Sequence, residues 1–289
     1  MSIRNFVPEV WNANLLVALR KTLIYGSPLI VNRNYQGDIA EHGDTVRVTS
    51  VGRPTISDYV PNVTKLTPEQ LNTGQRTLTI DQAKSFSFEV DDVDARQAAG
   101  TFMQEAAGEA GFGLADVMDQ YIAGLYTAIP ASQRLDLLTL AGGAATASTN
   151  VPKVYDELLV PLSVRLDELN VPAAGRYAVM PPWVYGVLRR DSRFIEADKS
   201  ANPGALRTGQ VGGAAGFTIL VSNNTPEPVP GQNVVQAGNN SAITMAEQIS
   251  KTEAFRPQDA FSDALKGLSL YGAKVFRPDA LVMGTVGRS

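Results

Sequence analysis

"LTIDQAKSFSFEV", residues 78–90, alternates almost strictly between two kinds of side chain. The odd positions carry small or acidic residues, and the even positions carry Leu78, Ile80, Gln82, Lys84, Phe86, Phe88 and Val90. A period of two residues is typical of a β-strand that packs one face on a core. The stretch therefore predicts a strand, and the choice of its partner decides the fold.

An upstream segment supplies a partner for this strand. Pairing Val46 with Phe88 and Ile56 with Leu78 satisfies a single antiparallel register, because both pairs of residue numbers have the same sum. The turn then falls inside the polar stretch NVTKLTPEQLNTGQ, residues 62–75. The sequence thus predicts one long hairpin whose tip carries no evident chemistry.

The even face of the strand is apolar at both ends and polar in the middle. One continuous core would not be interrupted in this way, so we interpret Phe86 and Phe88 as the root, packed on the chain's own domain. Leu78 and Ile80 would then form an apolar face near the tip that is exposed in an isolated chain. A strand of about 15 residues reaches about 50 Å, the diameter of a compact globule of this size. The alternative is a hairpin folded back over its own domain.

A long helix is predicted after the hairpin. In VDDVDARQ, residues 90–97, Asp91 or Asp92 suits a helix N-cap, whereas a calcium loop would need a glycine and a terminal glutamate that are missing. The helix is expected to end at about Ile129, before Pro130. Its apolar stripe consists of Leu114, Met118, Tyr121 and Leu125. Several glycines interrupt it, which predicts a bend or the close approach of another backbone.

The remainder of the chain mixes helices and strands. Amphipathic helices are predicted over 9–25 and over 152–170, the second with a break at Pro161. The segments RYAVM (176–180) and GFTILVSN (216–223) are apolar enough for buried strands. This order favours an α+β fold and not a regular series of strand–helix–strand units.

Composition excludes several classes of function. The chain has 289 residues, a formal net charge of -4, one histidine and no cysteine. Disulfides and thiolate metal sites are therefore impossible, and the charge balance does not suggest a sequence-specific nucleic-acid binder. We find no signal-peptide pattern and no apolar run of the ~18 residues that a membrane span needs. We expect a soluble, cytosolic chain without a membrane partner.

No motif for catalysis is present. The single histidine, His42, has no second histidine for a zinc site, and no nucleophile elbow accompanies it. The glycines of GQVGGAAGF, residues 209–217, precede a strand, whereas a dinucleotide-binding loop follows one. We expect no catalytic, metal-binding or cofactor-binding residues. A soluble α/β enzyme remains as the alternative of a different class.

Two further stretches carry a resemblance to a known family. LRTGQVGGAAGFTILVSNNTP (206–226) and YGAKVFRPDALVMGTV (271–286) resemble segments of the major capsid proteins of tailed bacteriophages. The order of an N-terminal arm, a long hairpin, a long helix and a mixed body is also similar. The resemblance implies the Hong Kong 97 capsid fold, with a spine helix and peripheral and axial domains.

The resemblance also implies a division of the chain. Residues 1–36 would be the N-terminal arm, and 44–90 the extended loop that lies across a neighbouring subunit. Residues 91–140 would be the peripheral domain with the spine helix, and 141–255 mainly the axial domain. Residues 256–289 would return to the peripheral domain and end in a closing strand.

Function and partners follow from the resemblance as expectations. Such a chain self-assembles as hexamers and pentamers into an icosahedral shell, which encloses double-stranded DNA without sequence-specific binding. A separate scaffolding protein, a portal and possibly a decoration protein would be partners. The location would be the virion capsid, assembled in the cytoplasm of the bacterial host. The runner-up is an encapsulin-type nanocompartment shell.

The intersubunit residues implied by this assignment lie in the arm, the hairpin and a proline-rich loop at 223–233. They are Trp11, Leu15, Leu16, Lys65, Leu66, Leu71, Arg76, Leu78, Ile80, Asn224, Pro226 and Pro228. Some family members cross-link a loop lysine to a peripheral-domain asparagine. The segment 256–267 contains no asparagine, so we expect no cross-link through Lys65 or Lys84.

Overall fold

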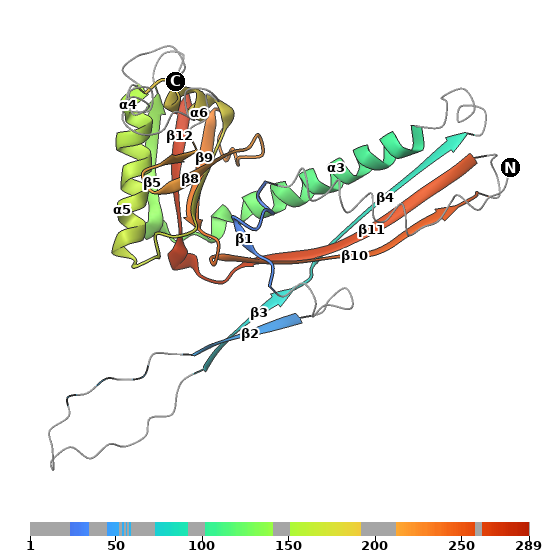
Figure 1. Ribbon diagram of the computed structural model, residues 1–289, viewed down its shortest axis with the longest axis horizontal. Coiled ribbons are helices and arrows are strands. Elements are labelled where there is room, and N and C mark those ends of the chain that lie inside the picture. Colours follow the sequence, from blue (N-terminus) through green and yellow to red (C-terminus); the bar gives the residue numbers. More distant parts are fainter. Residues whose placement is uncertain are drawn as a thin grey trace.

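The protein is an elongated molecule with two β-sheets and a hairpin that leaves the body (Figure 1). The computed structural model describes residues 24–34, 45–51, 54, 56, 58, 73–91, 102–140, 151–191, 212–257 and 262–288. Both sheets mix parallel and antiparallel pairs and are accompanied by helices, as expected for an α+β fold.

The six-stranded sheet has the order β5-β12-β9-β6-β8-β7. Its strands are β5 (Arg134–Leu140), β6 (Arg176–Met180), β7 (Gly213–Ala214), β8 (Phe217–Val221), β9 (Gln232–Asn239) and β12 (Leu281–Arg288). All five residues of β6 are buried, which agrees with its unbroken apolar sequence and central position. The predicted buried strand at 176–180 is therefore confirmed, whereas the strand predicted at 216–223 is present as β8 but is only partly buried.

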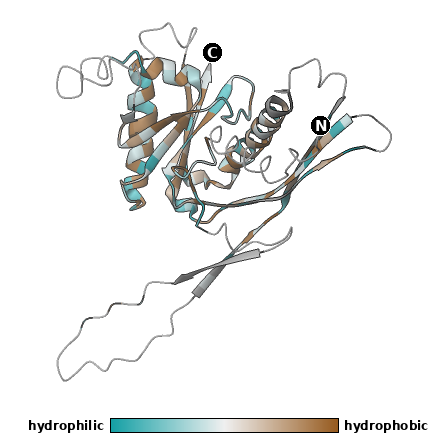
Figure 2. Ribbon diagram, turned by 45° about the vertical axis from the view of Figure 1, so that its right-hand side comes forward, coloured by the Kyte–Doolittle hydropathy of each residue, from teal (hydrophilic) through white to brown (hydrophobic). Residues whose placement is uncertain are grey.

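Helices cover this sheet. They are α4 (Val151–Lys153), a π-helical segment (Val154–Leu159), α5 (Val160–Glu168) and α6 (Pro182–Leu188). The break expected at Pro161 takes the form of the π-helical segment, which ends just before it. Leu158 lies against β12 so closely that a Cβ on Gly284 would be 2.4 Å from its Cδ1 atom. Hydrophobic and hydrophilic residues share the surface of α5, as expected of a helix with one buried side (Figure 2).

The four-stranded sheet has the order β1-β10-β11-β4 and consists mainly of long strands. Its members are β1 (Val31–Asn32), β4 (Gln82–Asp91), β10 (Ile243–Phe255) and β11 (Ser262–Val275). Helix α3 (Phe102–Ala123) runs beside it (Figure 1). Phe86 packs against Leu114 and Ala115 of α3, and the rings of Tyr121 and Tyr271 meet edge to face at 5.5 Å.

The projecting hairpin is shorter and differently paired than the alternation predicted. β2 (Thr45–Val51) pairs with β3 (Thr73–Thr79), and Val46 lies opposite Leu78 instead of Phe88. Phe88 lies in β4, opposite Leu265 of β11. The predicted register and the single strand over 78–90 are therefore wrong. Alternation continues through Ile80 and Asp81, but the strand changes its partner there.

The predicted exposure of Leu78 and Ile80 is also wrong. Each side chain is only 1% exposed, and both pack with Ala246, Leu270 and Phe276 of the same chain. The physical reason is the break after Thr79, where the chain passes from β3 to β4. At this point the two side chains pack against the long strands β10 and β11. They form the root of the hairpin.

Helix α3 confirms part of the predicted long helix. It is followed by a 3-10 segment, Gly124–Ala128, and the helical region ends before Pro130 as expected. Asp91 is the last residue of β4, so it is not a helix cap, which corrects one of the two predicted caps. The other, Asp92, lies outside the described part, as do residues 93–101. Among the described residues, nothing lies within 4 Å of a Cβ built at Gly108, Gly113 or Gly124, so the close approach of another described backbone does not explain these glycines.

Both sheets combine strands that the sequence analysis assigned to different domains. β10 joins the long strands β11 and β4, whereas β12 lies between β5 and β9. Searching the described residues reveals no helix that combines the length and apolar character needed to cross a membrane.

Candidate intersubunit surfaces

The hairpin of β2 and β3 is the most conspicuous surface feature of the molecule (Figure 1). It forms a two-stranded sheet of its own, and in the described part of the chain neither of its strands pairs with a strand of the larger sheets. An isolated two-stranded hairpin is at best marginally stable in water, so a projecting one gains stability from a surface that it covers. This geometry suits a contact with another molecule.

A compact set of contacts, here called the hairpin joint, fixes the base of the hairpin on the body. It consists of Arg76 and Thr77 from β3 and of Gly272, Lys274 and Phe276 from β11 and its end. The Arg76 guanidinium donates a hydrogen bond to the carbonyl oxygen of Phe276. The Lys274 ammonium donates one to the carbonyl oxygen of Thr77, 2.9 Å away. The joint therefore combines two cationic hydrogen bonds with the apolar packing below it.

Arg76 thus has a partner within its own chain, although the sequence reading assigned it to an intersubunit contact. Its side chain remains exposed. Leu78 and Ile80 anchor the joint from inside and contribute no exposed apolar surface. Of the residues predicted for the hairpin interface, Lys65, Leu66 and Leu71 lie outside the described residues. The same holds for Trp11, Leu15 and Leu16 of the arm.

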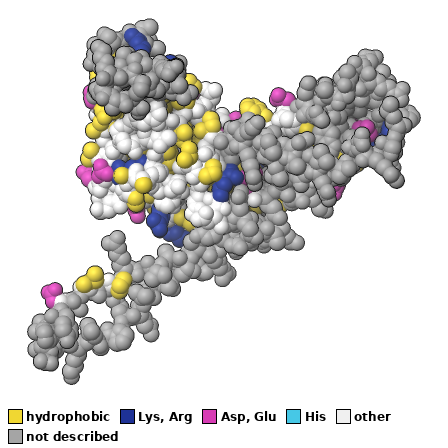
Figure 3. All heavy atoms as spheres, in the orientation of Figure 1, with side chains coloured by type: hydrophobic (Ala, Val, Ile, Leu, Met, Phe, Trp, Pro, Cys, Tyr) yellow, Lys and Arg dark blue, Asp and Glu magenta, His cyan; other side chains and the backbone are white. Residues whose placement is uncertain are grey.

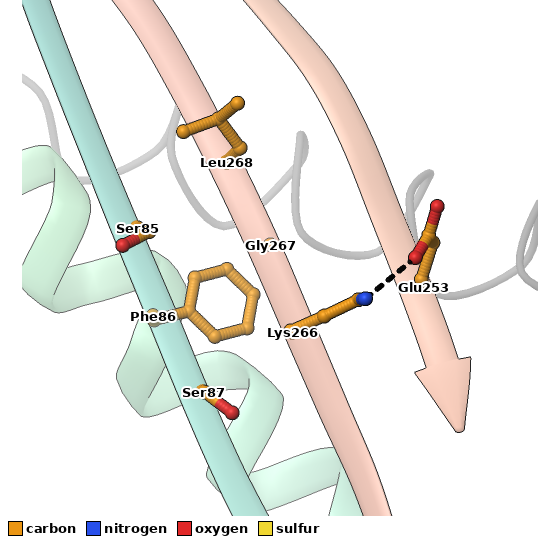
Figure 4. A pocket seen from close by; sticks show the side chains of 7 residues that line it. All are labelled: Ser85, Phe86, Ser87, Glu253, Lys266, Gly267 and Leu268. Atoms are coloured by element: carbon orange, nitrogen blue, oxygen red, sulfur yellow. Dashed lines mark ion pairs between the residues drawn. The ribbon is translucent and has the colours of Figure 1, made fainter.

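A shallow groove lies on the long strands β4, β10 and β11, away from the hairpin joint (Figure 4). Its volume is about 450 Å³, and Ser85, Ser87, Glu253, Lys266 and Leu268 supply lining side chains. Lys266 and Glu253 form an ion pair at 2.9 Å, with each side chain about half exposed. An ion pair this exposed contributes little to stability, about 0–1 kcal/mol. Its groups therefore remain accessible for contact with a partner.

The proline-rich loop at 223–233 is bound to the body at its start. The Asn224 amide donates to Asp116 Oδ1 at 2.7 Å and to Asp119 Oδ2 at 3.1 Å, both on α3. Pro226 accepts a hydrogen bond from the Val234 backbone. Of the three predicted loop residues, only Pro228 is exposed. The outer part of this loop is the accessible part.

A polar hollow of about 390 Å³ lies between this loop and the start of α6. Trp183 Nε1 donates to Asn233 Oδ1 at 2.9 Å, and Asn233 reaches Thr225 Oγ1 at 3.4 Å. Pro181, Pro182, Asn223, Glu227 and Gly231 complete the lining. Because Trp183, Asn233 and Thr225 are hydrogen-bonded to one another, we interpret the hollow as the ordered base of the loop.

Asp119 is the centre of a network that the sequence reading missed. Its carboxylate accepts hydrogen bonds from the backbone of Ile24 at 2.9 Å and of Tyr25 at 2.6 Å, in addition to Asn224. Burial raises the pKa of this carboxyl group, and the three hydrogen bonds oppose that rise. An aspartate between Met118 and Tyr121 of the apolar stripe was the available signal. Asp119 therefore joins the backbone at Ile24 and Tyr25 to helix α3.

The described residues contain no group of three or more histidine, aspartate or glutamate side chains that could hold a metal ion. His42 lies outside the described part. Burial is the main reason why the pKa values of the tyrosines with a shifted pKa are raised. The pKa of Tyr121 rises to about 12. The face seen in Figure 3 carries its described hydrophobic side chains in several small groups and not in one large patch.

Comparison with known proteins gives a consistent picture. A family model described as phage capsid protein matches residues 75–284. The structure labelled Mycobacterium phage Che8 is 30% identical, with a TM-score of 0.70, covering 91% of this chain and 90% of that one. The capsid structure of the cyanophage P-SCSP1u is 20% identical, with a TM-score of 0.71, covering 92% and 89%. The mature capsid of bacteriophage PhiM1 is 20% identical, with a TM-score of 0.61, covering 85% and 82%. No curated protein matches the sequence.

Proposed function

The chain belongs to the phage capsid protein family, and we propose that it is a major capsid protein that forms closed icosahedral shells of hexamers and pentamers. Its role is structural and not enzymatic, and its place is the capsid of the virion. The observation that carries the proposal is the projecting β2–β3 hairpin, held at a fixed base but unpaired with the chain's own sheets. Such an element finds its covering surface on a neighbouring copy.

The division into domains supports this assembly. We assign α3 and the long strands β4, β10 and β11 to the peripheral domain. The six-stranded sheet with α5 and α6 is assigned to the axial domain, whose exposed loop around Pro228 and Val229 would face the symmetry axes. This assignment differs from the expected residue ranges for β10, now peripheral, and for β5 and β12, now axial. Trp11, Leu15, Leu16, Lys65, Leu66 and Leu71 remain proposed contact residues of the arm and hairpin.

The shell is proposed to enclose double-stranded DNA without reading its sequence. The formal net charge of -4 argues against strong electrostatic attraction to DNA, so packaging would depend on other components. We propose a separate scaffolding protein, a portal and possibly a decoration protein as partners, with assembly in the cytoplasm of the bacterial host. An encapsulin-type shell would have the same fold but hold protein cargo.

Negative-stain electron microscopy of the purified chain, with and without co-expressed candidate scaffolding protein, tests the proposal. Closed particles of uniform diameter are expected in at least one condition. Particles isolated from infected cells should contain double-stranded DNA, and cargo protein in place of DNA would favour the nanocompartment. A chain that stays monomeric in every condition would contradict the shell.

A further inference from the structure

The two large sheets share one long antiparallel ribbon of strands. Strand β9 of the six-stranded sheet continues after residues 240–242 as β10 of the four-stranded sheet, and β11 continues after 276–280 as β12. The strands pair in both halves of the ribbon, β9 with β12 and β10 with β11. We call the two connections, 240–242 and 276–280, the sheet junction. A change in the angle between the sheets therefore bends the ribbon at this junction.

The two sides of the sheet junction differ in length. Four residues lie between Gly238 and Ile243 on one side, whereas five lie between their partners, Leu281 and Val275, on the other. The 3-10 turn Pro278–Ala280 lies on the longer side. An extra residue on one strand of an antiparallel pair bends the pair, and the strands run in clearly different directions on either side of the junction (Figure 1).

Hydrogen bonds and packing hold the two sides of the sheet junction together. The carbonyl oxygen of Ala242 accepts hydrogen bonds from the backbone N–H groups of Phe276, at 2.8 Å, and of Arg277, at 3.1 Å. Ala242 is fully buried. A Cβ on Gly238 would be only 2.5 Å from the carbonyl oxygen of Ala280. Movement of one connection is therefore passed directly to the other.

Phe276 also holds the base of the projecting hairpin. Its carbonyl oxygen accepts the hydrogen bond from the Arg76 guanidinium, and its side chain packs with Leu78 and Ile80. One residue thus contacts the hairpin through its carbonyl group and side chain, and the sheet junction through its N–H group. The base of the hairpin is bonded to the bend between the sheets, in addition to its covalent continuation into β4.

We propose that Phe276 couples the direction of the hairpin to the angle between the two sheets. When the junction bends, the peptide groups of Phe276 move with Ala242, and the hydrogen bond from Arg76 and the packed root of the hairpin move with them. Packed side chains and hydrogen bonds are the contacts that carry such coupling. The coupling is a property of the single chain. Its use in a shell rests on the proposed function: hexamers and pentamers require different angles between neighbours, and the hairpin adjusts with the body of its own subunit.

The distance between two spin labels on the unassembled chain tests the coupling. Because the chain has no cysteine, Ile56→Cys with Ser87→Cys places one label on the hairpin and one on β4. Both positions are exposed. Ile56 lies eight residues beyond Val48, the partner of Arg76, so an extended chain places its label up to about 26 Å from the hairpin joint. A small movement at the joint is therefore enlarged at the label.

Gly238→Ala perturbs the sheet junction and leaves every residue of the hairpin joint unchanged. The atoms nearest to the added methyl group belong to Ala280 and Leu281, and they must yield by about 1 Å to restore ordinary van der Waals contact. We expect the distance between the labels to shift by about 2 Å or more, because the label on the hairpin lies far from the joint. Gly284→Ala is the matched control: its Cβ would be 2.4 Å from Leu158 Cδ1, and it should leave the distance unchanged.

Asn239→Ala decides the matter if circular dichroism shows that Gly238→Ala does not fold. Asn239 fixes the shorter connection, since its amide donates to the carbonyl oxygen of Ala174 at 2.7 Å and its Oδ1 accepts from the backbone of Ser241 at 3.1 Å. Its loss should broaden the distribution of distances between the labels. An unchanged distribution in either folded variant would overturn the coupling, as would an equal shift in Gly284→Ala. Because the labels report on single chains, these results leave the proposed shell standing.

Discussion

Gly272 lies so close to Thr79 that a Cβ on the glycine would be only 2.4 Å from the threonine carbonyl oxygen. The contact occurs where β3 leaves the body, beside the hydrogen bond from Lys274 to Thr77. A side chain of any size at position 272 must therefore displace the base of the hairpin or the strand that carries it.

We expect Gly272→Ala to lower the stability of the unassembled chain by about 1–3 kcal/mol, because the added methyl group overpacks the joint. This corresponds to roughly 2–5 °C in the thermal midpoint for a chain of this length. Gly113→Ala is the control, since nothing lies within 4 Å of a Cβ there and alanine favours the helix. Thermal melts of both variants check the prediction, and equal midpoints would contradict it.

Substitutions at Leu78 and Ile56 distinguish the buried root of the hairpin from its projecting part. Leu78→Ala removes a side chain that is 1% exposed, and we expect it to cost about 2–5 kcal/mol. Ile56 is 95% exposed, so Ile56→Ala should leave the stability of the unassembled chain within about 0.5 kcal/mol of the wild type. Urea unfolding monitored by circular dichroism measures both. A large loss in Ile56→Ala would mean that the hairpin folds back on its own domain.

The hairpin also shows how far the sequence alone could lead. Alternation over 78–90 correctly marked β4 as a strand, but it covered only the end of β3 and could not show that the chain changes partners at Ile80 and Asp81. Neither glycine nor proline marks that break, and a period of two says nothing about which strand lies alongside. Leu78 and Ile80 were consequently predicted to be exposed, although both are buried.

Long-range polar contacts were equally inaccessible. Asn224 and Asp119 are 105 positions apart, and their hydrogen bond depends on the placement of a loop against a helix. The overall order of elements was recognisable because it follows from local patterns and from stretches of family-like sequence. The Asp119 network was not, because each of its hydrogen bonds joins segments that only the tertiary fold brings together.

Asn224→Ala should destabilise the chain more at neutral than at acidic pH. Burial raises the pKa of Asp119, and the hydrogen bond from Asn224 is the largest of the influences that lower it. A carboxyl group whose pKa is raised on folding favours the folded state most below its ordinary pKa, and this contribution falls as pH rises through the shifted pKa. Removing the Asn224 donor raises the pKa further and so steepens this fall.

The expected loss at neutral pH is about 1.5–3 kcal/mol, typical of a hydrogen bond to a charged group. Once Asp119 is protonated, the loss should shrink. Free energies of unfolding at about pH 4 and about pH 7, for wild type and Asn224→Ala, measure the difference. Asn223→Ala is the neighbouring control, since Asn223 is exposed. A loss that is equal at both pH values would show that Asn224 does not act through the Asp119 charge.

Arg76 and Lys274 are expected to set the direction of the hairpin more than the stability of the body. Both side chains are exposed, and each donates to a single backbone carbonyl across the joint. Hydrogen bonds of this kind contribute about 0.5–1.5 kcal/mol each, so Arg76→Ala with Lys274→Ala should lower the free energy of unfolding by about 1–3 kcal/mol.

Without these two hydrogen bonds, Leu78 and Ile80 still anchor the base, but the angle between hairpin and long strands is less restricted. In a shell that repeats this angle in every subunit, we expect fewer closed particles and a broader distribution of diameters. Arg190→Ala is the control, because it removes an exposed cation that follows α6 and takes no part in the joint. Electron microscopy of particles assembled from each variant gives the readout. Particles of wild-type number and uniformity in the double variant would show that packing at Leu78 and Ile80 alone fixes the hairpin.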